Sequence, residues 1–433
     1  MEPRTLPNRR LPNRWLIALA AVLMQVCLGS VYAWSVFTKP LMAMSVANHD
    51  PWSLTRVSAT FTIAMSCLGI GTVIGGAWQD RVGPRIVSTA AGIFYGCGFL
   101  IAALATSMHS LYGIYAGYGL FCGLGMGMGY ICPVATITKW FPDKRGLMTG
   151  AAVMGFGAGA LVMSPIAARM IAAVGVPQTF VTFGTAYLIL IVTAAQFYSN
   201  PPQGWRPDGW EPRTAVSKAA STVDFTVSEA LGTGRFWLLW LMISLNTSAG
   251  ISIISQASPL AQQQLRLTAV EASAIVGIIS VFNALGRVFW AWVSDFIGRS
   301  QVYFLLFAIQ IFLFFALPSL HEVAIFSVVV CAIALCYGGG FGVMPSFTAD
   351  FFGSRYMGGI YGWILLGWGF AAIPSPLLIA YVHDRTGTYE YAIFVIGFVM
   401  LVATVFPVLA WRIVKRMAAD AKAIENPAAT PHS

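Results

Sequence analysis

The sequence predicts an all-α polytopic membrane protein with twelve transmembrane helices in two pseudo-symmetric six-helix bundles. Of its 433 residues, 58% are hydrophobic and 9% are charged, whereas about 25% of an average soluble domain is charged. Apolar runs of about twenty residues or more recur along the chain, and each can cross a hydrocarbon core roughly 30 Å thick. Two loop patterns also occur once in each half of the chain. A transmembrane β-barrel is excluded, because barrel strands alternate apolar and polar residues over about ten positions.

Long apolar runs bounded by charged residues or proline define the expected spans. They cover approximately residues 15–38, 56–78, 87–107, 110–138, 147–170, 177–198, 236–260, 270–293, 302–318, 322–346, 358–381 and 391–411. The first run resembles a signal peptide, because Arg9, Arg10 and Arg14 precede it. It continues to about Phe37 without a clear cleavage site, so we expect it to remain as the first span.

The longest polar stretch separates the two halves of the chain. It runs from Ser199 to Arg235 and contains four prolines and alternating charges. We therefore expect an N-terminal bundle of residues 1–198, a cytoplasmic linker of residues 199–235, a C-terminal bundle of residues 236–415 and a cytoplasmic tail of residues 416–433.

The basic residues predict an orientation in the membrane and argue against a nucleic-acid partner. Twenty-five Lys and Arg against sixteen Asp and Glu leave a net charge of +9, but the basic residues form short clusters between apolar runs instead of one patch. Nineteen lie on the side of the termini and five on the other side, which predicts cytoplasmic termini by the positive-inside rule. The tail from Arg412 to Lys422 is expected to contact lipid headgroups. The remaining basic residue is Arg287.

The cysteines give no sign of a disulfide framework or a metal site. All seven fall inside apolar runs, with no CxxC spacing and no cysteine and histidine cluster. We therefore expect no disulfide and no bound metal. The sequence has no Walker motif either, so no ATP and no other cofactor is expected.

The repeated loop patterns indicate an internal duplication. The loops after the second and eighth spans share aspartate, glycine and arginine: Gly76, Asp80, Arg81, Gly83 and Arg85 in the first, and Asp295, Gly298 and Arg299 in the second. The loops after the fourth and tenth spans share proline, paired aromatic residues and glycine: Pro133, Trp140, Phe141 and Gly146 against Pro345, Phe351, Phe352 and Gly358. Duplicated halves with a binding site at their interface are the usual plan of secondary transporters.

These motifs resemble a known family. The stretch from Gly76 to Arg85 resembles the loop signature of the major facilitator superfamily. Three further stretches resemble its oxalate:formate antiporter and bacterial monocarboxylate transporter group: GSVYAWS from Gly29 to Ser35, KWFPDKRGL from Lys139 to Leu147, and NALGR from Asn283 to Arg287. The resemblance implies the fold of that superfamily, a bacterial inner-membrane location, function as a monomer, and transport by alternating access.

Arg287 is the expected centre of the binding site. It lies about eight residues before the end of the eighth span, roughly 12 Å into a core about 30 Å thick. A charge at that depth costs at least about 2.5–3.5 kcal/mol, and no Asp or Glu lies at comparable depth in any expected span. We expect its partner to be an anionic substrate, because a guanidinium matches a carboxylate, and the resemblance implies the same role. The alternative is an arginine that binds backbone carbonyls at a helix break.

Other side chains are expected to complete the site. Asn283 and Ser280 share the helix face of Arg287 and could hydrogen-bond a carboxylate or a neighbouring hydroxyl or keto oxygen. Polar contact between helices is the alternative reading for both. The resemblance implies aromatic site positions at Tyr32, Tyr130 and Tyr337, and also at Phe156 and Phe341, where the antiporter has tyrosines.

The expected substrate class depends on one difference from the antiporter. The resemblance places Trp368 where the oxalate antiporter has a second buried cation, a lysine. A site with one cation becomes neutral when it binds a monoanion, whereas a dianion leaves an unbalanced charge at low dielectric. A small monocarboxylate such as lactate, pyruvate or formate is therefore expected, with Trp368 packing against its apolar part. An oxalate:formate antiporter is the alternative.

The loop charges are expected to form a gate. Asp80 with Arg81 and Arg85, and Asp295 with Arg299, lie at cytoplasmic helix ends, where ion pairs and helix-terminus contacts hold the two halves together. Coupling by proton symport or by exchange with a counter-anion remains open, because no buried acid or histidine offers itself as a proton carrier.

Functions from two other classes are alternatives to transport. An intramembrane enzyme would need a buried catalytic pair or metal ligands, and the spans contain neither. A transport-like receptor that senses a carboxylate without moving it is compatible with the sequence, and only a flux measurement separates it from a carrier.

Overall fold

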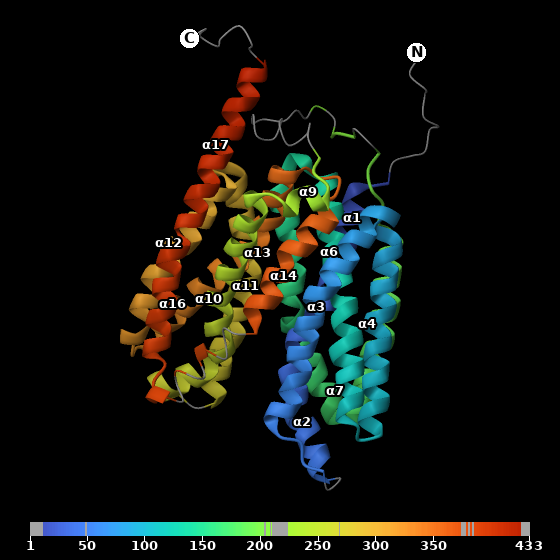
Figure 1. Ribbon diagram of the computed structural model, residues 1–433. Helices are drawn as coiled ribbons and strands as arrows, with labels where there is room; N and C mark the ends of the chain where they lie inside the picture. The colour runs from blue at the N-terminus through green and yellow to red at the C-terminus, as the bar shows by residue number, and fades with distance from the viewer. Residues whose placement is uncertain are drawn as a thin grey trace.

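The computed structural model describes residues 12–47, 50–202, 205–207, 209, 224–267, 269–373, 378–379, 382 and 385–425, and the regular elements in these residues are helices (Figure 1). In chain order they are α1 Arg14–Gly29, η1 Ser30–Ala33, α2 Trp34–Ala47, α3 Leu54–Val82, α4 Pro84–Ser107, α5 Leu111–Ile114, η2 Tyr115–Cys122, α6 Gly123–Trp140, η3 Pro142–Lys144, α7 Arg145–Ala195, α9 Val227–Leu231, α10 Gly234–Leu265, α11 Ala269–Ile297, α12 Arg299–Ala316, η4 Leu317–Ser319, α13 Val323–Phe352, α14 Met357–Ala372, α16 Glu390–Ala403 and α17 Val405–Glu425.

The expected spans correspond to the long helices. Among the described residues, ten helices are long and apolar enough to cross a membrane. One of them contains α7, which holds both the fifth and the sixth expected spans because the chain turns at Gly175, where φ is 81°. The eleventh expected span begins as α14, and residues 374–377 and 380–381 of that span lie outside the described residues. The prediction of an all-α polytopic protein is confirmed.

Helix boundaries follow local capping chemistry. The side chains of Asn13, Ser53 and Thr233 accept hydrogen bonds from the first turns of α1, α3 and α10, which satisfies backbone N–H groups that lack a partner within the helix. In the expected linker, Thr226 and Glu229 form a capping box that begins α9. The backbone and side-chain hydrogen bonds from Thr226 hold the pKa of the Glu229 carboxyl below its usual range. Residues 203–204, 208 and 210–223 of that linker lie outside the described residues.

The helices form two groups, α1 to α7 and α10 to α17, which stand side by side in Figure 1. We call the end of the molecule at which α1 begins and α17 ends the terminal end. The groups meet where α3 packs on α14 and where α11 packs on α7. Glycine makes both contacts close: a Cβ added at Gly76 would lie 2.0 Å from the Gly358 carbonyl oxygen, and one added at Gly150 would lie 2.5 Å from the Arg287 carbonyl oxygen. Small residues of this kind let helix backbones approach one another in membrane proteins.

The two Asp-containing loops have the same backbone form. Asp80 and Asp295 each precede by three residues a glycine with positive φ, Gly83 at 89° and Gly298 at 99°. Each of these glycines ends one long helix and begins the next, α3 to α4 and α11 to α12. Because a left-handed backbone strains most other residues, both loops require glycine at this position, as the internal repeat predicts.

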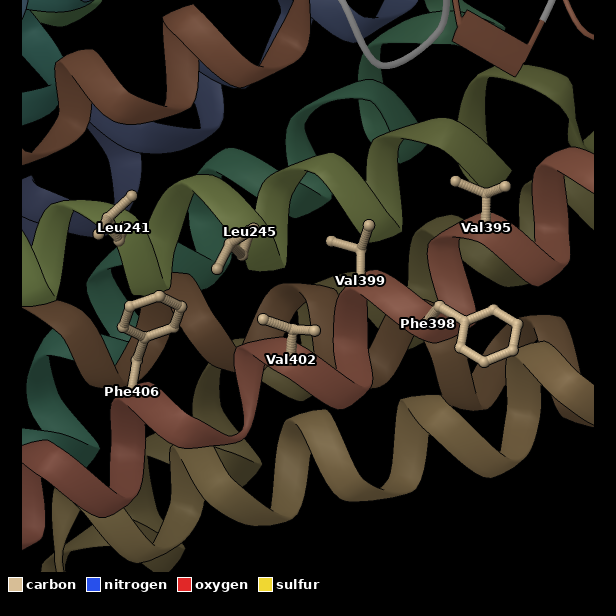
Figure 2. A pocket seen from close by; sticks show the side chains of 7 residues that line it. All are labelled: Leu241, Leu245, Val395, Phe398, Val399, Val402 and Phe406. Atoms are coloured by element: carbon tan, nitrogen blue, oxygen red, sulfur yellow. The ribbon is translucent and has the colours of Figure 1, made fainter.

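An apolar pocket lies on the outer face of the second group, between α10, α16 and α17 (Figure 2). Its volume is about 460 Å³, and it is lined by Leu241, Leu245, Val395, Phe398, Val399, Val402 and Phe406. Ligand sites need a few polar groups to orient the ligand, and these seven side chains supply none. This apolar pocket is therefore a poor candidate for the binding site.

Candidate functional site

Arg287 is fully buried where the two helix groups meet. It lies on α11, ten residues before the helix ends at Ile297, which is about 15 Å from that end at 1.5 Å per residue. Its Nε donates to Asn283 Oδ1 at 3.5 Å, and its Nη1 donates to the Val153 carbonyl on α7 at 3.3 Å. Its Nη2 is buried and has no hydrogen-bond partner among the described residues. No carboxylate in that part of the chain forms an ion pair with it.

Glycines on α13 and α7 allow α11 to pack closely against both helices. A Cβ at Gly342 on α13 would lie 2.0 Å from the Arg287 carbonyl oxygen, and a Cβ at Gly157 on α7 would lie 3.3 Å from Arg287 Nε. Larger side chains would push α11 away from both helices. The depth and orientation of Arg287 therefore depend on residues from both halves of the chain.

Aromatic rings enclose the guanidinium. Arg287 Cζ lies 5.1 Å from the centre of the Phe341 ring and 5.8 Å from that of Phe156, distances at which cation–π attraction operates. The rings continue as a chain, with centroid separations of 5.4 Å for Tyr32 and Phe156, 5.1 Å for Tyr130 and Phe156, 6.0 Å for Phe156 and Trp368, 4.9 Å for Phe341 and Trp368, and 5.2 Å for Tyr337 and Phe341. Rings from both helix groups thus form one cluster.

Eight of the nine expected binding residues meet in this cluster. They are Arg287, Asn283, Tyr32, Tyr130, Tyr337, Trp368, Phe156 and Phe341. Ser280 is half-buried on the same helix, seven residues before Arg287. Tyr32, on η1, is also half-buried, whereas Tyr130, Phe156, Phe341 and Trp368 are completely buried.

The cluster contains several buried groups that can donate a hydrogen bond and have no partner in the described part of the chain. Five buried polar atoms in it have no partner among the described residues: Arg287 Nη2, Tyr32 Oη, Tyr130 Oη, Tyr361 Oη and Trp368 Nε1. Guanidinium and indole nitrogens only donate, and a hydroxyl donates as well as accepts. Each buried group without a partner costs about 1–3 kcal/mol. A carboxylate, which only accepts, is the complementary group for this arrangement.

Tyr361 is the member of the site that the sequence did not predict. It is fully buried on α14, seven residues before Trp368, and this spacing places both on one helix face. The spacing is a signal that could have identified it once Trp368 was chosen. Its ring is close enough to Arg287 and to Tyr130 to interact electrostatically with both.

A second polar site lies at the terminal end and joins the two groups at two equivalent places. Asp80 at the end of α3 accepts from the backbone N–H groups of Gly358 at 3.3 Å and Gly359 at 2.6 Å, in the first turn of α14. Asp295 at the end of α11 accepts from Gly146 and Leu147, both at 3.0 Å, in the first turn of α7. A carboxylate at a helix N-terminus is stabilised by the free N–H groups and by the helix dipole. Each aspartate thus caps a helix of the other group.

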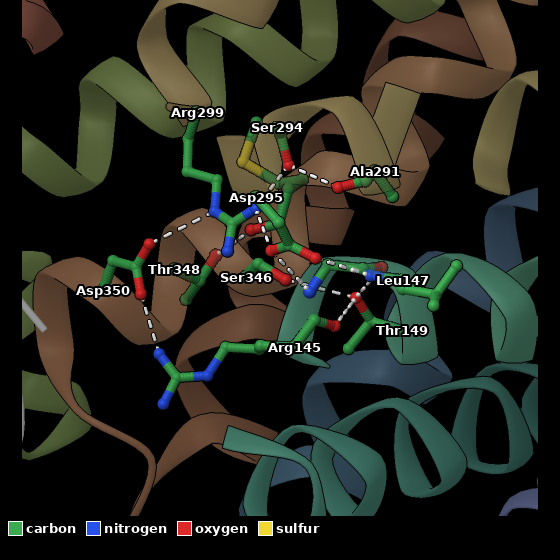
Figure 3. Close-up of polar contacts among 12 residues, drawn as sticks. Arg145, Leu147, Thr149, Ala291, Ser294, Asp295, Arg299, Ser346, Thr348 and Asp350 are labelled. Atoms are coloured by element: carbon green, nitrogen blue, oxygen red, sulfur yellow. Dashed lines mark hydrogen bonds and ion pairs between the residues drawn. The ribbon is translucent and has the colours of Figure 1, made fainter. Parts of the chain in front are cut away.

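Ion pairs extend the contact around Asp295 (Figure 3). Arg299 binds Asp295 at 2.7 Å and Asp350 at 3.3 Å, and Asp350 also binds Arg145 of the other group at 2.7 Å. Beside this network lies a cavity of about 820 Å³ whose lining includes these four residues. Thr149 and Ser346 of the two groups also bond each other, at 3.1 Å, and near the other cap Asp80 pairs with Lys139 at 3.8 Å.

Three of the five residues predicted to form a gate lie in this network, and two do not. Asp80, Asp295 and Arg299 all lie in the network, and Asp295 pairs with Arg299. Arg81 and Arg85 are exposed, and the ion pair of Asp80 is with Lys139. Lys139, Arg145 and Asp350 also belong to this network, and the sequence does not predict them there. The first two belong to the KWFPDKRGL stretch, which was therefore a usable signal.

In the described residues the cysteines form no disulfide, and the potential metal ligands do not gather into a site. All seven cysteines are free. Among the described residues, no group of three or more His, Cys, Asp or Glu could hold a metal ion.

Comparison with known proteins extends over nearly the whole chain. The family model described as Major Facilitator Superfamily matches residues 14–373 and 247–431. The oxalate:formate antiporter of Oxalobacter formigenes is 30% identical over 356 residues, which are 81% of each protein. Apicoplast pyruvate carrier 1 of Toxoplasma gondii is 25% identical over 474 residues, covering 86% of this chain and 84% of the carrier. The crystal structure of the E. coli fucose:proton symporter FucP shares the fold, with a TM-score of 0.69 at 10% identity over 91% of this chain and 98% of the symporter.

Proposed function

We propose that this chain, which belongs to the major facilitator superfamily, carries small monocarboxylate anions of the lactate, pyruvate or formate type by alternating access. It is a multi-pass membrane transporter and not an enzyme. The substrate binds at Arg287, within the aromatic cluster between the two helix groups. Arg287, Asn283, Tyr32, Tyr130, Tyr337, Trp368, Phe156, Phe341 and Ser280 are the proposed binding residues.

The buried and incompletely paired guanidinium carries this proposal. A charge at membrane depth costs several kcal/mol, roughly 2.5–3.5 on insertion scales, and persists in proteins where it binds a partner or a ligand. Binding to backbone carbonyls is the competing explanation, but it accounts only for Nη1, which donates to Val153. Nη2 keeps its hydrogens free in a site with other unpaired donors, which favours an anionic ligand.

The single positive charge favours a monoanion. Trp368 is completely buried against Phe341 and Phe156, where it would pack on the apolar part of a substrate. A dianion bound to Arg287 alone would leave one negative charge unbalanced at low dielectric. The names of the two relatives, an oxalate:formate antiporter and a pyruvate carrier, support carboxylates as the class. Exchange of oxalate for formate is the alternative function, supported by the 30% identity to that antiporter.

The transport cycle follows from the two aspartate caps. We place both termini in the cytoplasm of a bacterial inner membrane, so the terminal end is the cytoplasmic end. Residues 1–198 and 236–415 form the two bundles, joined by a linker of residues 199–235 and followed by a tail of residues 416–433. In this conformation the caps of Asp80 and Asp295 close the cytoplasmic side. Rocking of the bundles breaks the caps and exposes Arg287 to the cytoplasm.

The coupling ion is the remaining part of the proposal. Among the described residues, no carboxylate forms an ion pair with Arg287. In proton symport the proton would therefore travel on the substrate carboxyl, while Arg287, which stays protonated, balances the charge of the bound anion. Exchange for a second anion needs no proton carrier. The protein is proposed to act as a monomer in contact with lipid.

Counterflow in proteoliposomes tests the function. Lactate, pyruvate, formate, acetate and oxalate are compared with and without a pH gradient. We expect uptake of the monocarboxylates, at least a hundredfold loss in Arg287→Ala and Arg287→Lys, and wild-type uptake in the control Arg206→Ala, which removes an exposed charge. Wild-type uptake of every substrate by Arg287→Lys would refute the role of the guanidinium. Binding without flux would instead identify a carboxylate receptor.

A further inference from the structure

Tyr361 lies on the cytoplasmic side of Arg287. It is four residues into α14, about 6 Å from the start of that helix at 1.5 Å per residue, whereas Arg287 is about 15 Å from the same end of the bundle. Tyr130 is ten residues before the end of α6, at about the depth of Arg287 by the same measure. The two tyrosines come from different helix groups, and α14 packs on α6.

Three buried polar groups without hydrogen-bond partners in the described part of the chain lie near one another, although their helix positions differ in depth. Arg287 Nη2, Tyr130 Oη and Tyr361 Oη are buried without a hydrogen-bond partner among the described residues. Tyr130 lies within side-chain hydrogen-bonding reach of both Arg287 and Tyr361, and Tyr361 is close enough to Arg287 to interact with it electrostatically, but the three atoms are not aligned for hydrogen bonds with one another. Buried polar groups in proteins normally have hydrogen-bond partners. Three neighbouring groups that lack partners therefore indicate a binding site and not an isolated packing defect.

We infer that Tyr361 is a substrate-binding residue, which donates its hydroxyl to the same carboxylate that Arg287 and Tyr130 bind. This inference rests on the proposed function. A carboxylate has two oxygens with about four lone-pair positions, which is enough to accept from Nη2 and both hydroxyls at once. Donation by a hydroxyl to an ionised oxygen is stronger than donation to a neutral one.

The three residues come from both helix groups, which matters for transport. Tyr130 belongs to the first helix group, and Arg287 and Tyr361 belong to the second. A bound carboxylate thus connects α6 with α11 and α14, and without it these donors face one another. Substrate occupancy stabilises the approach of the two groups through this contact, which a ligand held by Arg287 alone could not do.

Removal of single hydroxyl groups tests the inference. Tyr361→Phe keeps the ring and removes only Oη, and Tyr130→Phe does the same on the other side. The matched control is Tyr198→Phe, since Tyr198 is also completely buried, its hydroxyl also lacks a partner, and its neighbours are Cys27 and Cys132 rather than Arg287. A hydrogen bond to a charged group contributes enough that its loss should raise KM about tenfold or more.

The expected pattern is specific to carboxylate binding. Tyr361→Phe and Tyr130→Phe should each raise the KM for acetate and for pyruvate by about the same factor, with a smaller effect on kcat, while Tyr198→Phe stays within about twofold of wild type. Equal equilibrium affinities of Tyr361→Phe and wild type for both anions would overturn the inference. A loss for pyruvate but not for acetate would also overturn it, because the hydroxyl would then contact the keto oxygen.

These results separate the inference from the proposed function. If wild-type protein moves acetate and pyruvate and Arg287→Ala does not, the function stands, and the Tyr361→Phe result alone decides the inference. If wild-type protein moves and binds no monocarboxylate, both fail. Equal purification yield and thermal stability of the three Phe variants, measured on the full chain in detergent, shows that the comparison concerns binding.

Discussion

The cap that Asp295 places on α7 should set the balance between the two sides of the cycle. Replacing Asp295 with alanine removes two hydrogen bonds of 3.0 Å to Gly146 and Leu147 and the 2.7 Å ion pair with Arg299. Hydrogen bonds to a charged group contribute about 1.5–3 kcal/mol. Because the Asp295 side chain is 22% exposed, we take about 2–3 kcal/mol for the whole set after solvent screening. That energy corresponds to a shift of about 30- to 150-fold toward the state that is open to the cytoplasm.

Accessibility of a buried gate residue measures this shift. Ser346 is completely buried and bonds Thr149 across the two groups, so a cysteine placed there in a chain without its native cysteines reacts only when the gate opens. With opening and closing fast, the labelling rate in inside-out vesicles follows the open population. Asp295→Ala should therefore speed labelling of that cysteine about 30-fold or more, by the same conversion from energy to population.

A matched substitution provides the control. Asp143 also forms an ion pair, at 2.9 Å with Arg14, but both residues belong to the α1 to α7 group. Asp143→Ala thus removes a pair of similar geometry without loosening the interface between the groups. Equal labelling rates in Asp295→Ala and Asp143→Ala would refute the reasoning, since the cap would then have no part in closing the gate.

Three further predictions follow from single contacts. Trp368→Lys adds a second cation beside Arg287 and should move selectivity toward oxalate over formate by about tenfold or more, read as the ratio of kcat/KM values; an unchanged ratio would show that charge balance does not select the substrate. Gly76→Ala places a Cβ 2.0 Å from the Gly358 carbonyl oxygen and should disfavour the closed gate. Faster labelling of a cysteine in place of Ser346 would reveal this shift, and an unchanged labelling rate would contradict it. Asn246→Ala removes a 2.9 Å hydrogen bond to the Tyr337 carbonyl and should lower the free energy of unfolding by about 1–3 kcal/mol. A lower apparent melting temperature in detergent would show this loss; an unchanged temperature would mean that the carbonyl is already satisfied within α13.

The sequence by itself determined the features that depend on local composition. Whether a segment can cross a membrane depends on its own length and hydrophobicity, so the spans were predictable. This includes the two spans within α7, between which the chain turns at Gly175. The solitary basic residue at membrane depth and the duplicated aspartate loops are also local observations. The aromatic members of the site came from the resemblance to a family, because single aromatic residues within a span carry no positional signal of their own.

Only the tertiary structure decided which groups meet across the interface. Asp80 stands next to Arg81 in the chain, yet it binds Lys139 and the first turn of α14. The N–H groups at the start of α14 have no partner within that helix, and only the packing of the helices brings Asp80 to them. Asp350 forms ion pairs with both Arg145 and Arg299, which lie far from it in the sequence and are brought to it by helix packing. Tyr361 lies near Arg287 because glycine contacts bring α14 close to α3, and α11 close to α7 and α13. Hydrophobicity can be summed residue by residue along the chain, whereas these contacts depend on the relative position of helices that are far apart in sequence.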